Sequence, residues 1–185
     1  MLDRIIVEQS NTGKVVNLSG QQRMLSQRIS LFTFEYLTIG NAESKKNALL
    51  AVDKMKKNHQ ILLSDYYEAI NKGQTQPFSK TLQDMYFNEP LNIDKKIKLF
   101  TRLVEQSLSL STKNRPPNSQ IDMSFLALAK EPLLSALNTV VEQYEKESLD
   151  KVNELRFTQD VVLGIIILTI FIEAFFIFRP MADRI

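Results

Sequence analysis

The chain has 185 residues, of which 44% are hydrophobic, and a formal net charge of +2 at pH 7. This length suits one domain with a hydrophobic core rather than two, and the small charge argues against nucleic acid as a partner, because proteins that bind phosphates along a duplex carry a strongly basic face. The absence of cysteine from the sequence excludes disulfides and thiolate metal sites, and only five glycines favour long helices over many tight turns.

The first predicted helix runs from about Leu2 to Thr38 and ends at Gly40 and Asn41. Its core-facing seam alternates steps of four and three and is mostly apolar: Asn11, Val15, Leu18, Gln22, Leu25, Ile29, Phe32 and Tyr36. A second seam with the same alternation lies roughly 160° around the helix: Gln9, Gly13, Val16, Gly20, Arg23 and Gln27. A helix with two seams has two sets of neighbours, and glycine allows close backbone approach, so the second seam predicts a subunit contact.

The second seam also predicts an anion site. If two copies meet there about a two-fold axis, Arg23 faces its own twin, and the two guanidiniums repel until an anion lies between them. The planar fork of arginine suits an oxyanion, Gly20 leaves room, and Gln27 or Asn17 could add hydrogen bonds. The pattern alone leaves an alternative open, in which Arg23 and Arg28 are ordinary exposed residues on a solvated helix face.

The second predicted helix begins after Asn41, which acts as its N-cap, and ends at residues 71–73. Its core stripe again alternates steps of four and three: Ala48, Val52, Met55, His59, Leu62, Tyr66 and Ala69. The single histidine, His59, lies in this stripe, so we expect a hydrogen-bonded structural side chain rather than a metal ligand. We also expect Met24 to fill the core.

A connection with a short helix at about Ser79 to Tyr86 leads to a helix from about Ile93 to Ser111. The stretch KNRPPNSQ, residues 113–120, predicts a break between two helices. The last helix begins near Asp122 and contains Pro132, which predicts a kink or the first turn of a new helix. Together these elements predict an all-α fold, an antiparallel four-helix bundle whose last helix continues into the membrane.

The apolar run from Val161 to Phe178 has the length required to cross a bilayer. The alternative, a buried core helix, fits less well because the run is apolar on all sides. Glu173 is the ionisable residue within it, and we assign it no role. Arg179 and Arg184 follow the run, so the positive-inside rule predicts a cytoplasmic C-terminus and an external bundle.

The predicted domains are therefore an extracytoplasmic sensor bundle at residues 1–158, a transmembrane helix at 159–179 and the start of a cytoplasmic connector at 180–185. The N-terminal residues do not resemble an export signal. We therefore expect the sequence to be a fragment that lacks a first membrane span. A tail-anchored protein whose bundle stays inside is the alternative.

The motif from Asn17 to Arg28, NLSGQQRMLSQR, resembles the P-box of nitrate/nitrite sensor kinases of the NarX and NarQ kind. It is even more similar to the opening motif of the PilJ-like sensor domain, with Asn, Gly, Arg-Met, Ser and the second Arg matched without a gap. This resemblance implies a dimeric periplasmic sensor in the bacterial inner membrane that holds nitrate or nitrite between two first helices. The implied ligand residue is Arg23, with Gly20 beside the site, Arg28 as a further candidate, and a cytoplasmic output domain in the full receptor.

Chemistry other than binding has little support in the sequence. It shows neither a phosphate-binding glycine loop nor a Ser-His-Asp arrangement, so we expect no enzyme, no metal and no cofactor. Two functions remain: a ligand-binding sensor module of a transmembrane receptor, and a membrane-anchored structural or adaptor bundle without a small ligand.

Overall fold

The computed structural model describes residues 2–73, 78–109 and 123–182, with side chains for residues 13–73, 78–109 and 123–176. The elements in chain order are α1 (Leu2–Ile39), α2 (Ala42–Asn71), α3 (Lys80–Phe87), α4 (Ile93–Ser109), α5 (Ser124–Leu128), the π-helical turn η2 (Ala129–Leu133) and α6 (Leu134–Ala182). Every element in these described ranges is helical, which confirms the predicted all-α class. The chain divides into two compact units, Met1–Glu145 (the bundle unit) and Lys146–Ile185 (the C-terminal unit).

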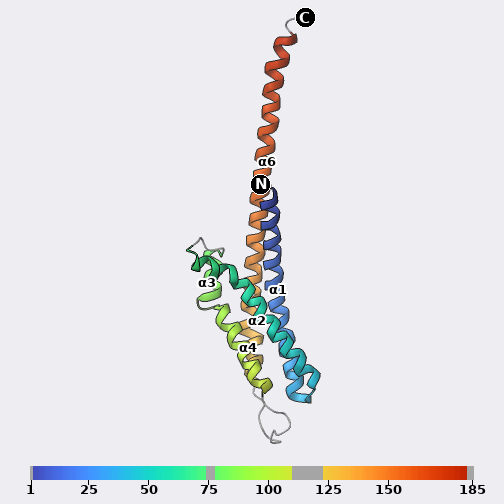
Figure 1. Ribbon diagram of the computed structural model, residues 1–185, viewed down its shortest axis with the longest axis vertical. Helices are drawn as coiled ribbons and strands as arrows, with labels where there is room; N and C mark the ends of the chain where they lie inside the picture. Colours follow the sequence, from blue (N-terminus) through green and yellow to red (C-terminus); the bar gives the residue numbers. More distant parts are fainter. Residues whose placement is uncertain (1, 74–77, 110–122, 183–185) are drawn as a thin grey trace. The chain divides into compact units, whose positions relative to one another are not determined.

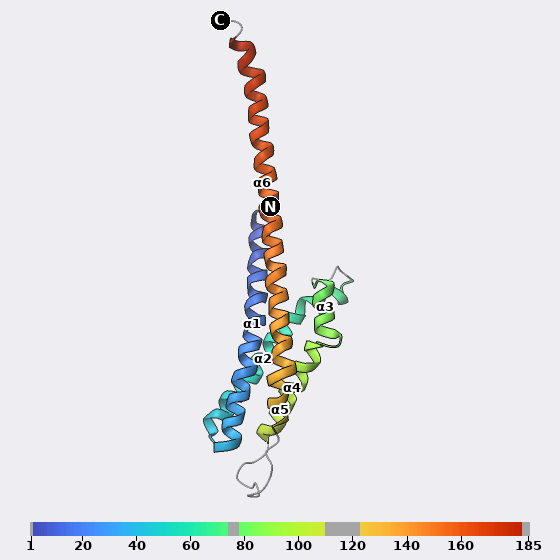
Figure 2. The ribbon, with the colours of Figure 1, turned by 180° about the vertical axis from the view of Figure 1, so that it is seen from behind.

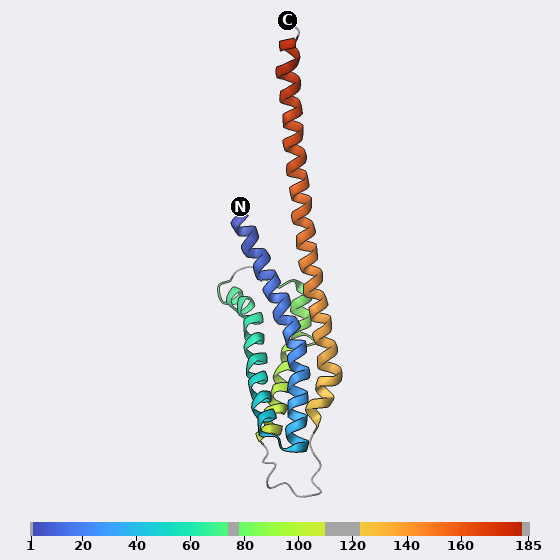
Figure 3. The ribbon, with the colours of Figure 1, turned by 90° about the vertical axis from the view of Figure 1, so that its right-hand side faces the viewer.

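The bundle unit is an antiparallel bundle of four long helical segments. Figures 1 and 3 show α1, α2, α4 and the first part of α6 side by side, with the chain reversing direction from each segment to the next. The short helix α3 lies in the connection between α2 and α4. In Figure 2, seen from behind, α5 lies next to α4. The predicted four-helix architecture is therefore confirmed.

Local signals set the helix ends where the sequence places them. Gly40 has φ +78°, a left-handed conformation that ends α1 and that glycine adopts without strain. The Asn41 side chain then accepts a hydrogen bond from the Glu43 N–H at 3.0 Å and so caps α2. Ser79 caps α3 in the same way, accepting from the Leu82 N–H at 3.1 Å. The predicted Asn41 cap and the short third helix are confirmed, and the Ser79 cap is an additional finding.

The predicted end of the helix before the break and the predicted start of the last helix both lie outside the described residues. The described part of α4 ends at Ser109, and the predicted break at residues 113–120 and the predicted start at Asp122 lie outside the described residues. Pro132 lies inside η2. Because a π-turn is wider than an α-turn, it accommodates a proline ring that would clash with the preceding turn, so a local widening between α5 and α6 takes the place of the predicted kink or new first turn.

The hydrophobic core confirms most of the two predicted stripes. On α1, Leu25, Ile29 and Tyr36 are buried, and Val15 and Phe32 pack against the core; Asn11 lies outside the described side chains. On α2 the whole stripe is buried except Tyr66, which packs against the core. The expectation for Met24 was wrong: its side chain is 40% exposed, because it lies beside Arg23 on the outer side of α1.

The C-terminal unit is one stretch of helix with an apolar surface. Within residues 124–176 an 18-residue window has a mean hydropathy of 2.1, and none of that window is buried. Large side chains such as Ile165 and Phe171 are more than half exposed. Such a surface is long and apolar enough to cross a membrane. The exact limits of the membrane span and its orientation stay predictions.

Candidate functional site

The NLSGQQRMLSQR motif of α1 divides its polar residues between two faces of one helix. Ser19, Gln22 and Ser26 are between 1% and 3% exposed, whereas Arg23 and Gln27 are exposed. The motif is therefore neither a solvated face nor a purely internal one. Its two halves have different surroundings and different chemistry.

The inward half continues into a buried polar stripe that follows steps of three and four: Ser19, Gln22, Ser26, Ser30 and Thr33. Its serines satisfy their hydroxyls within α1 itself. Ser19 donates to the Val16 carbonyl, Ser26 to the Arg23 carbonyl and Ser30 to the Ser26 carbonyl, each at 2.8 Å. Small hydroxyl side chains bonded to their own helix occupy little space, so they let a neighbouring helix approach closely.

Two side-chain amides join this part of α1 to α2. The Gln22 Nε2 donates to the Met55 carbonyl at 3.1 Å, and the Asn58 Nδ2 donates to the Gln21 Oε1 at 3.1 Å. Asn58 is 5% exposed, so both bonds lie at or near the core. The Gln22 Oε1 is buried and has no partner among the described residues. Gln22 lies in the predicted core seam, whereas the serine stripe was not predicted, although its spacing of three and four is visible in the sequence.

The outward half carries the predicted ligand residues. Gly20 is half-buried, and Arg23 and Gln27 are exposed on the same line of α1, whereas Val16 on that line packs against the core. The part of the second seam from Gly20 to Gln27 therefore lies outside the core of the bundle unit. A Cβ added at Gly13 or Gly20 would meet no atom within 4 Å. These glycines are thus not required by packing inside a single chain.

Arg23 has a neutral neighbour. Its Nη1 donates to the Oδ1 of Asn138 on α6 at 3.4 Å, a long hydrogen bond between residues 115 positions apart. Within the described part of the chain no carboxylate pairs with this guanidinium. The positive charge of Arg23 therefore lies next to the last helix without being neutralised by an ion pair among the described residues.

The other two candidates lie apart from Arg23. Arg28 is exposed, about 140° around α1 from Arg23, and its guanidinium carbon lies 5.7 Å from the centroid of the Phe32 ring. Asn17 is exposed, on the turn before Gly20. The structure therefore brings together Gly20, Arg23 and Gln27, and it does not bring Arg28 to them within one chain.

His59 is a structural side chain, as the sequence predicted. It is 6% exposed, and its Nε2 lies 2.8 Å from the Asp94 Oδ1, with Lys98 on the other oxygen of that carboxylate at 2.6 Å. Burial lowers the pKa of His59 and outweighs the opposing effect of Asp94, so the contact is a hydrogen bond from a neutral ring at pH 7. The described residues contain no cluster of three or more His, Cys, Asp or Glu side chains that could hold a metal ion.

Comparison with known proteins identifies a family domain in the first part of the chain. A PilJ domain is found at residues 5–86, which match the family described as the type IV pili methyl-accepting chemotaxis transducer N-terminal domain. The match spans nearly all of α1, the whole of α2 and most of α3, and includes the motif with Arg23. Neither a curated protein nor a solved structure gives a significant match to the chain.

Proposed function

We propose that the chain is the sensor module of a bacterial transmembrane chemotaxis transducer, and that it binds nitrate or nitrite between the α1 helices of two copies. The PilJ match over residues 5–86 supports the coarser part of this proposal, a chemotaxis-type sensor domain. The apolar helix of the C-terminal unit supports attachment to a membrane. The bundle then lies in the periplasm and an output domain in the cytoplasm.

The observation that supports an oxyanion as the ligand is the positive charge of Arg23, which lies on an exposed line of α1 and is not neutralised by an ion pair. Its hydrogen-bond partner is the neutral amide of Asn138 at 3.4 Å, and the neighbouring Gly20 has open space where a side chain would lie. If two such lines meet about a two-fold axis, the guanidiniums repel each other, and a small oxyanion between them removes that repulsion. The planar fork fits a planar anion.

The contact with Asn138 also suggests how binding reaches the last helix. An anion between two Arg23 side chains competes with Asn138 for the guanidinium, because a charged acceptor binds it more strongly than a neutral amide. Loss of that contact frees α6 to shift relative to α1 by a small packing change rather than by unfolding. Cysteine crosslinking across the dimer at positions 155 and 159 is expected to change on addition of nitrate. Identical crosslinking with and without nitrate contradicts this mechanism.

The decisive test is calorimetric titration of the full chain in detergent micelles with nitrate, nitrite, sulfate and chloride. Arg23→Ala removes both halves of the site at once, at about 1.5–3 kcal/mol for each charge-assisted contact, so we expect nitrate binding to become unmeasurable while the fold persists. Arg23→Lys should also bind poorly, because an ammonium lacks the planar fork. Arg28→Ala is the matched control and should have the smaller effect. Nitrate binding by Arg23→Ala at the parent level returns Arg23 to the alternative of an ordinary exposed residue on a solvated helix face. No nitrate binding by the parent chain favours the alternative of an adaptor bundle without a small ligand.

A second test separates the subunit contact from the ligand. Because a Cβ at Gly20 meets nothing within 4 Å, Gly20→Ala leaves the single chain intact and gains up to about 1 kcal/mol of helix propensity. If α1 packs closely against its twin there, the same variant weakens the dimer. Sedimentation equilibrium should show a larger monomer fraction for Gly20→Ala, and nitrate should lower the monomer fraction of the parent chain by mass action. Equal fractions in all cases would falsify the shared site.

A further inference from the structure

The single histidine of the chain lies where α2, α3 and α4 meet in the bundle unit. The His59 Nε2 is 2.8 Å from the Asp94 Oδ1, in the first turn of α4. The His59 ring stacks on the Tyr86 ring of α3, with 6.2 Å between the centroids and 22° between the planes. Only 6% of His59 and 1% of Tyr86 are exposed. A buried ring of the residue type that changes its charge between neutral and acidic pH therefore contacts two other helices.

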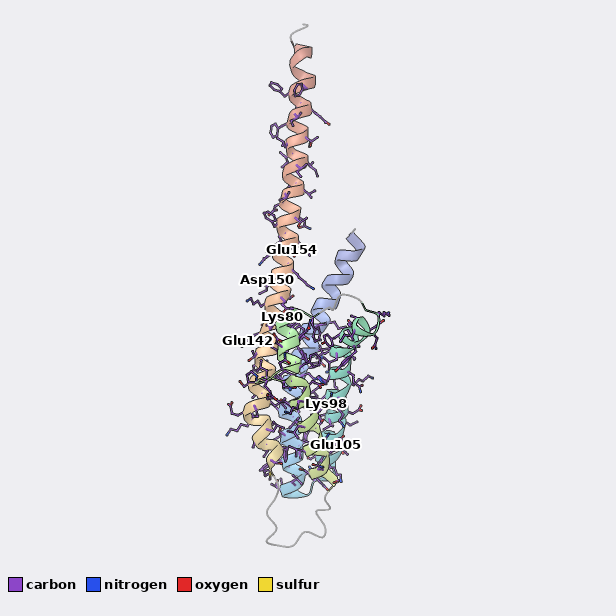
Figure 4. All side chains as sticks on the ribbon, turned by 90° about the vertical axis from the view of Figure 1, so that its left-hand side faces the viewer. Lys80, Lys98, Glu105, Glu142, Asp150 and Glu154 are labelled. Carbon is purple, nitrogen blue, oxygen red and sulfur yellow. The ribbon has the colours of Figure 1, made fainter. Side chains whose placement is uncertain are left out.

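One carboxylate serves two neighbours at this junction. The Asp94 Oδ1 lies against His59, and its Oδ2 accepts from the Lys98 Nζ at 2.6 Å, so the negative charge of Asp94 is already paired. Figure 4 shows Lys98 and Glu105 on α4, next to α2. A second proton on His59 would place two cations around one anion, with His59 and Asp94 largely out of water. Such an unbalanced charge is unfavourable.

The other polar and titratable groups around His59 do not balance a second cation. They are neutral amides, phenols, one closed ion pair and one further guanidinium: Gln21 and Gln22 of α1, Lys56 of α2, Tyr86 of α3, Arg102 and Glu105 of α4, and Tyr144 of α6. The closed pair is Lys56 with Glu105, at 2.6 Å. These surroundings favour the neutral form of His59.

The second ring nitrogen of His59 also favours the neutral form. The Nδ1 is buried and has no partner in the described part of the chain. In the imidazolium it becomes a donor that lacks an acceptor. Burial lowers the pKa of His59 and outweighs the effect of Asp94. An arrangement in which the ring reaches water avoids these costs, so each pH unit below the ordinary pKa of 6.5 favours that arrangement by up to about tenfold.

Tyr86 links His59 to the last helix of the bundle unit. The Tyr144 hydroxyl of α6 donates to the Tyr86 hydroxyl at 3.2 Å, and Tyr144 is 6% exposed. The Phe78 ring packs against both tyrosine rings, with centroids 5.2 Å from Tyr86 and 6.5 Å from Tyr144. Because α6 is one continuous helix from Leu134 to Ala182, Tyr144 lies on the helix that carries the apolar run. A movement of Tyr86 therefore changes the packing of that helix.

We propose that His59, Asp94, Tyr86 and Tyr144 form an acid switch in the bundle unit. At neutral pH the uncharged His59 holds α2, α3 and α4 together. In mildly acidic medium His59 takes up a proton and leaves its buried position, and the junction opens and changes the packing of Tyr144. The signal is the proton concentration around the bundle unit. The switch goes beyond the proposed nitrate site, because it uses none of the residues around Arg23.

The test follows the one histidine and Tyr144 by NMR, in the full chain in nitrate-free detergent micelles. Nitrogen-15 in the histidine ring reports its protonation directly, and carbon-13 in the tyrosine rings reports Tyr144, whose signal is the one missing from Tyr144→Phe. Between pH 7.5 and 5 we expect both signals to change reversibly with one midpoint below 6.5. Far-UV circular dichroism should keep its helical signal, because the opening is local.

Four variants separate a switch from a merely structural histidine. Asp94→Asn keeps an acceptor for the His59 Nε2 but loses the charge that favours the imidazolium, so the midpoint should fall by about 0.5 pH unit or more. Lys98→Gln removes a neighbouring cation, so the midpoint should rise. Lys57→Gln, an exposed lysine on α2, is the matched control and should not move it. His59→Gln should make the Tyr144 signal independent of pH over this range.

Three results overturn the proposal. The first is a Tyr144 signal that stays constant while His59 titrates, and the second is a loss of helical signal at the same midpoint, which means global unfolding. The third is a midpoint that does not move in opposite directions in Asp94→Asn and Lys98→Gln. Arg23→Ala should keep the parent's response to pH, so the acid switch and the nitrate site can fail separately. A response abolished by Arg23→Ala also overturns the proposal.

Discussion

Replacing Gln22 by methionine should stabilise the bundle unit, although it removes a hydrogen bond between two helices. Gln22 is 1% exposed, and its Nε2 donates to the Met55 carbonyl at 3.1 Å. Its Oε1 is buried without a partner among the described residues. The substitution therefore removes one satisfied group and one unsatisfied group from the core.

The two terms differ in size. The lost hydrogen bond contributes about 0.5–1.5 kcal/mol, and the Met55 carbonyl keeps its bond within α2. The unpaired oxygen costs about 1–3 kcal/mol, and methionine has nearly the same length and a better match to an apolar neighbourhood. The net gain in the free energy of unfolding for Gln22→Met is about 1 kcal/mol, or roughly 3 °C in Tm for a unit of this size.

Tyrosine signals allow the bundle unit to be followed by itself. The chain has five tyrosines and no tryptophan, and every tyrosine lies at or before residue 144, inside the bundle unit. Near-UV circular dichroism of the full chain in detergent, followed against urea, therefore reports this unit and not the membrane helix. Gln106→Met is the matched control, since Gln106 is exposed on α4 and lies outside the α1 seam, and we expect it to stay within about 0.5 kcal/mol of the parent.

A destabilisation of Gln22→Met by 1 kcal/mol or more, with Gln106→Met unchanged, would refute this reasoning and mean that the Gln22 oxygen is fully satisfied in solution. Because Gln22 faces α2 and Arg23 faces outward, nitrate binding by Gln22→Met should equal that of the parent. A stabilised variant that no longer responds to nitrate would instead assign the inward polar stripe a part in signalling.

Two further predictions follow from groups whose pKa values change on folding. Burial raises the pKa of Tyr86 to about 12, so the native state holds this proton more tightly than the unfolded chain, and the free energy of unfolding should fall by about 2–3 kcal/mol as the pH rises from 10 to 12. Urea unfolding across that range should show the loss in the parent and not in Tyr86→Phe. Burial lowers the pKa of His59 below its ordinary value of 6.5, so the unfolded chain takes up this proton first and stability should decline as the pH falls below 6.5. His59→Gln should remove that decline. A separate loss of stability should remain below about pH 3.8, where Asp94 becomes protonated. Desolvation raises the pKa of Asp94, but the hydrogen bonds from Lys98 and His59 outweigh it, so the pKa is lowered.

The sequence by itself determined the parts of this protein that depend on neighbouring residues along the chain. Gly40 and Asn41 mark the turn between α1 and α2 because glycine adopts positive φ and asparagine caps a helix, both of which are local effects. The steps of three and four in α1 and α2 determined which side of each helix faces the core, and an apolar run interrupted only by Glu173 determined the candidate membrane helix.

Only the tertiary structure decided which residues from distant parts of the chain meet. The Arg23 contact with Asn138 joins positions 115 apart, and the His59 contact with Asp94 joins positions 35 apart, so neither follows from spacing along one helix. Pro132 had two compatible outcomes in the sequence, a kink or the first turn of a new helix, and the structure places it inside a π-turn. Helical periodicity predicts which residues share a face of a helix. Whether the next helix covers that face depends on the tertiary structure, and this is why Ser26 is buried and Met24 is exposed.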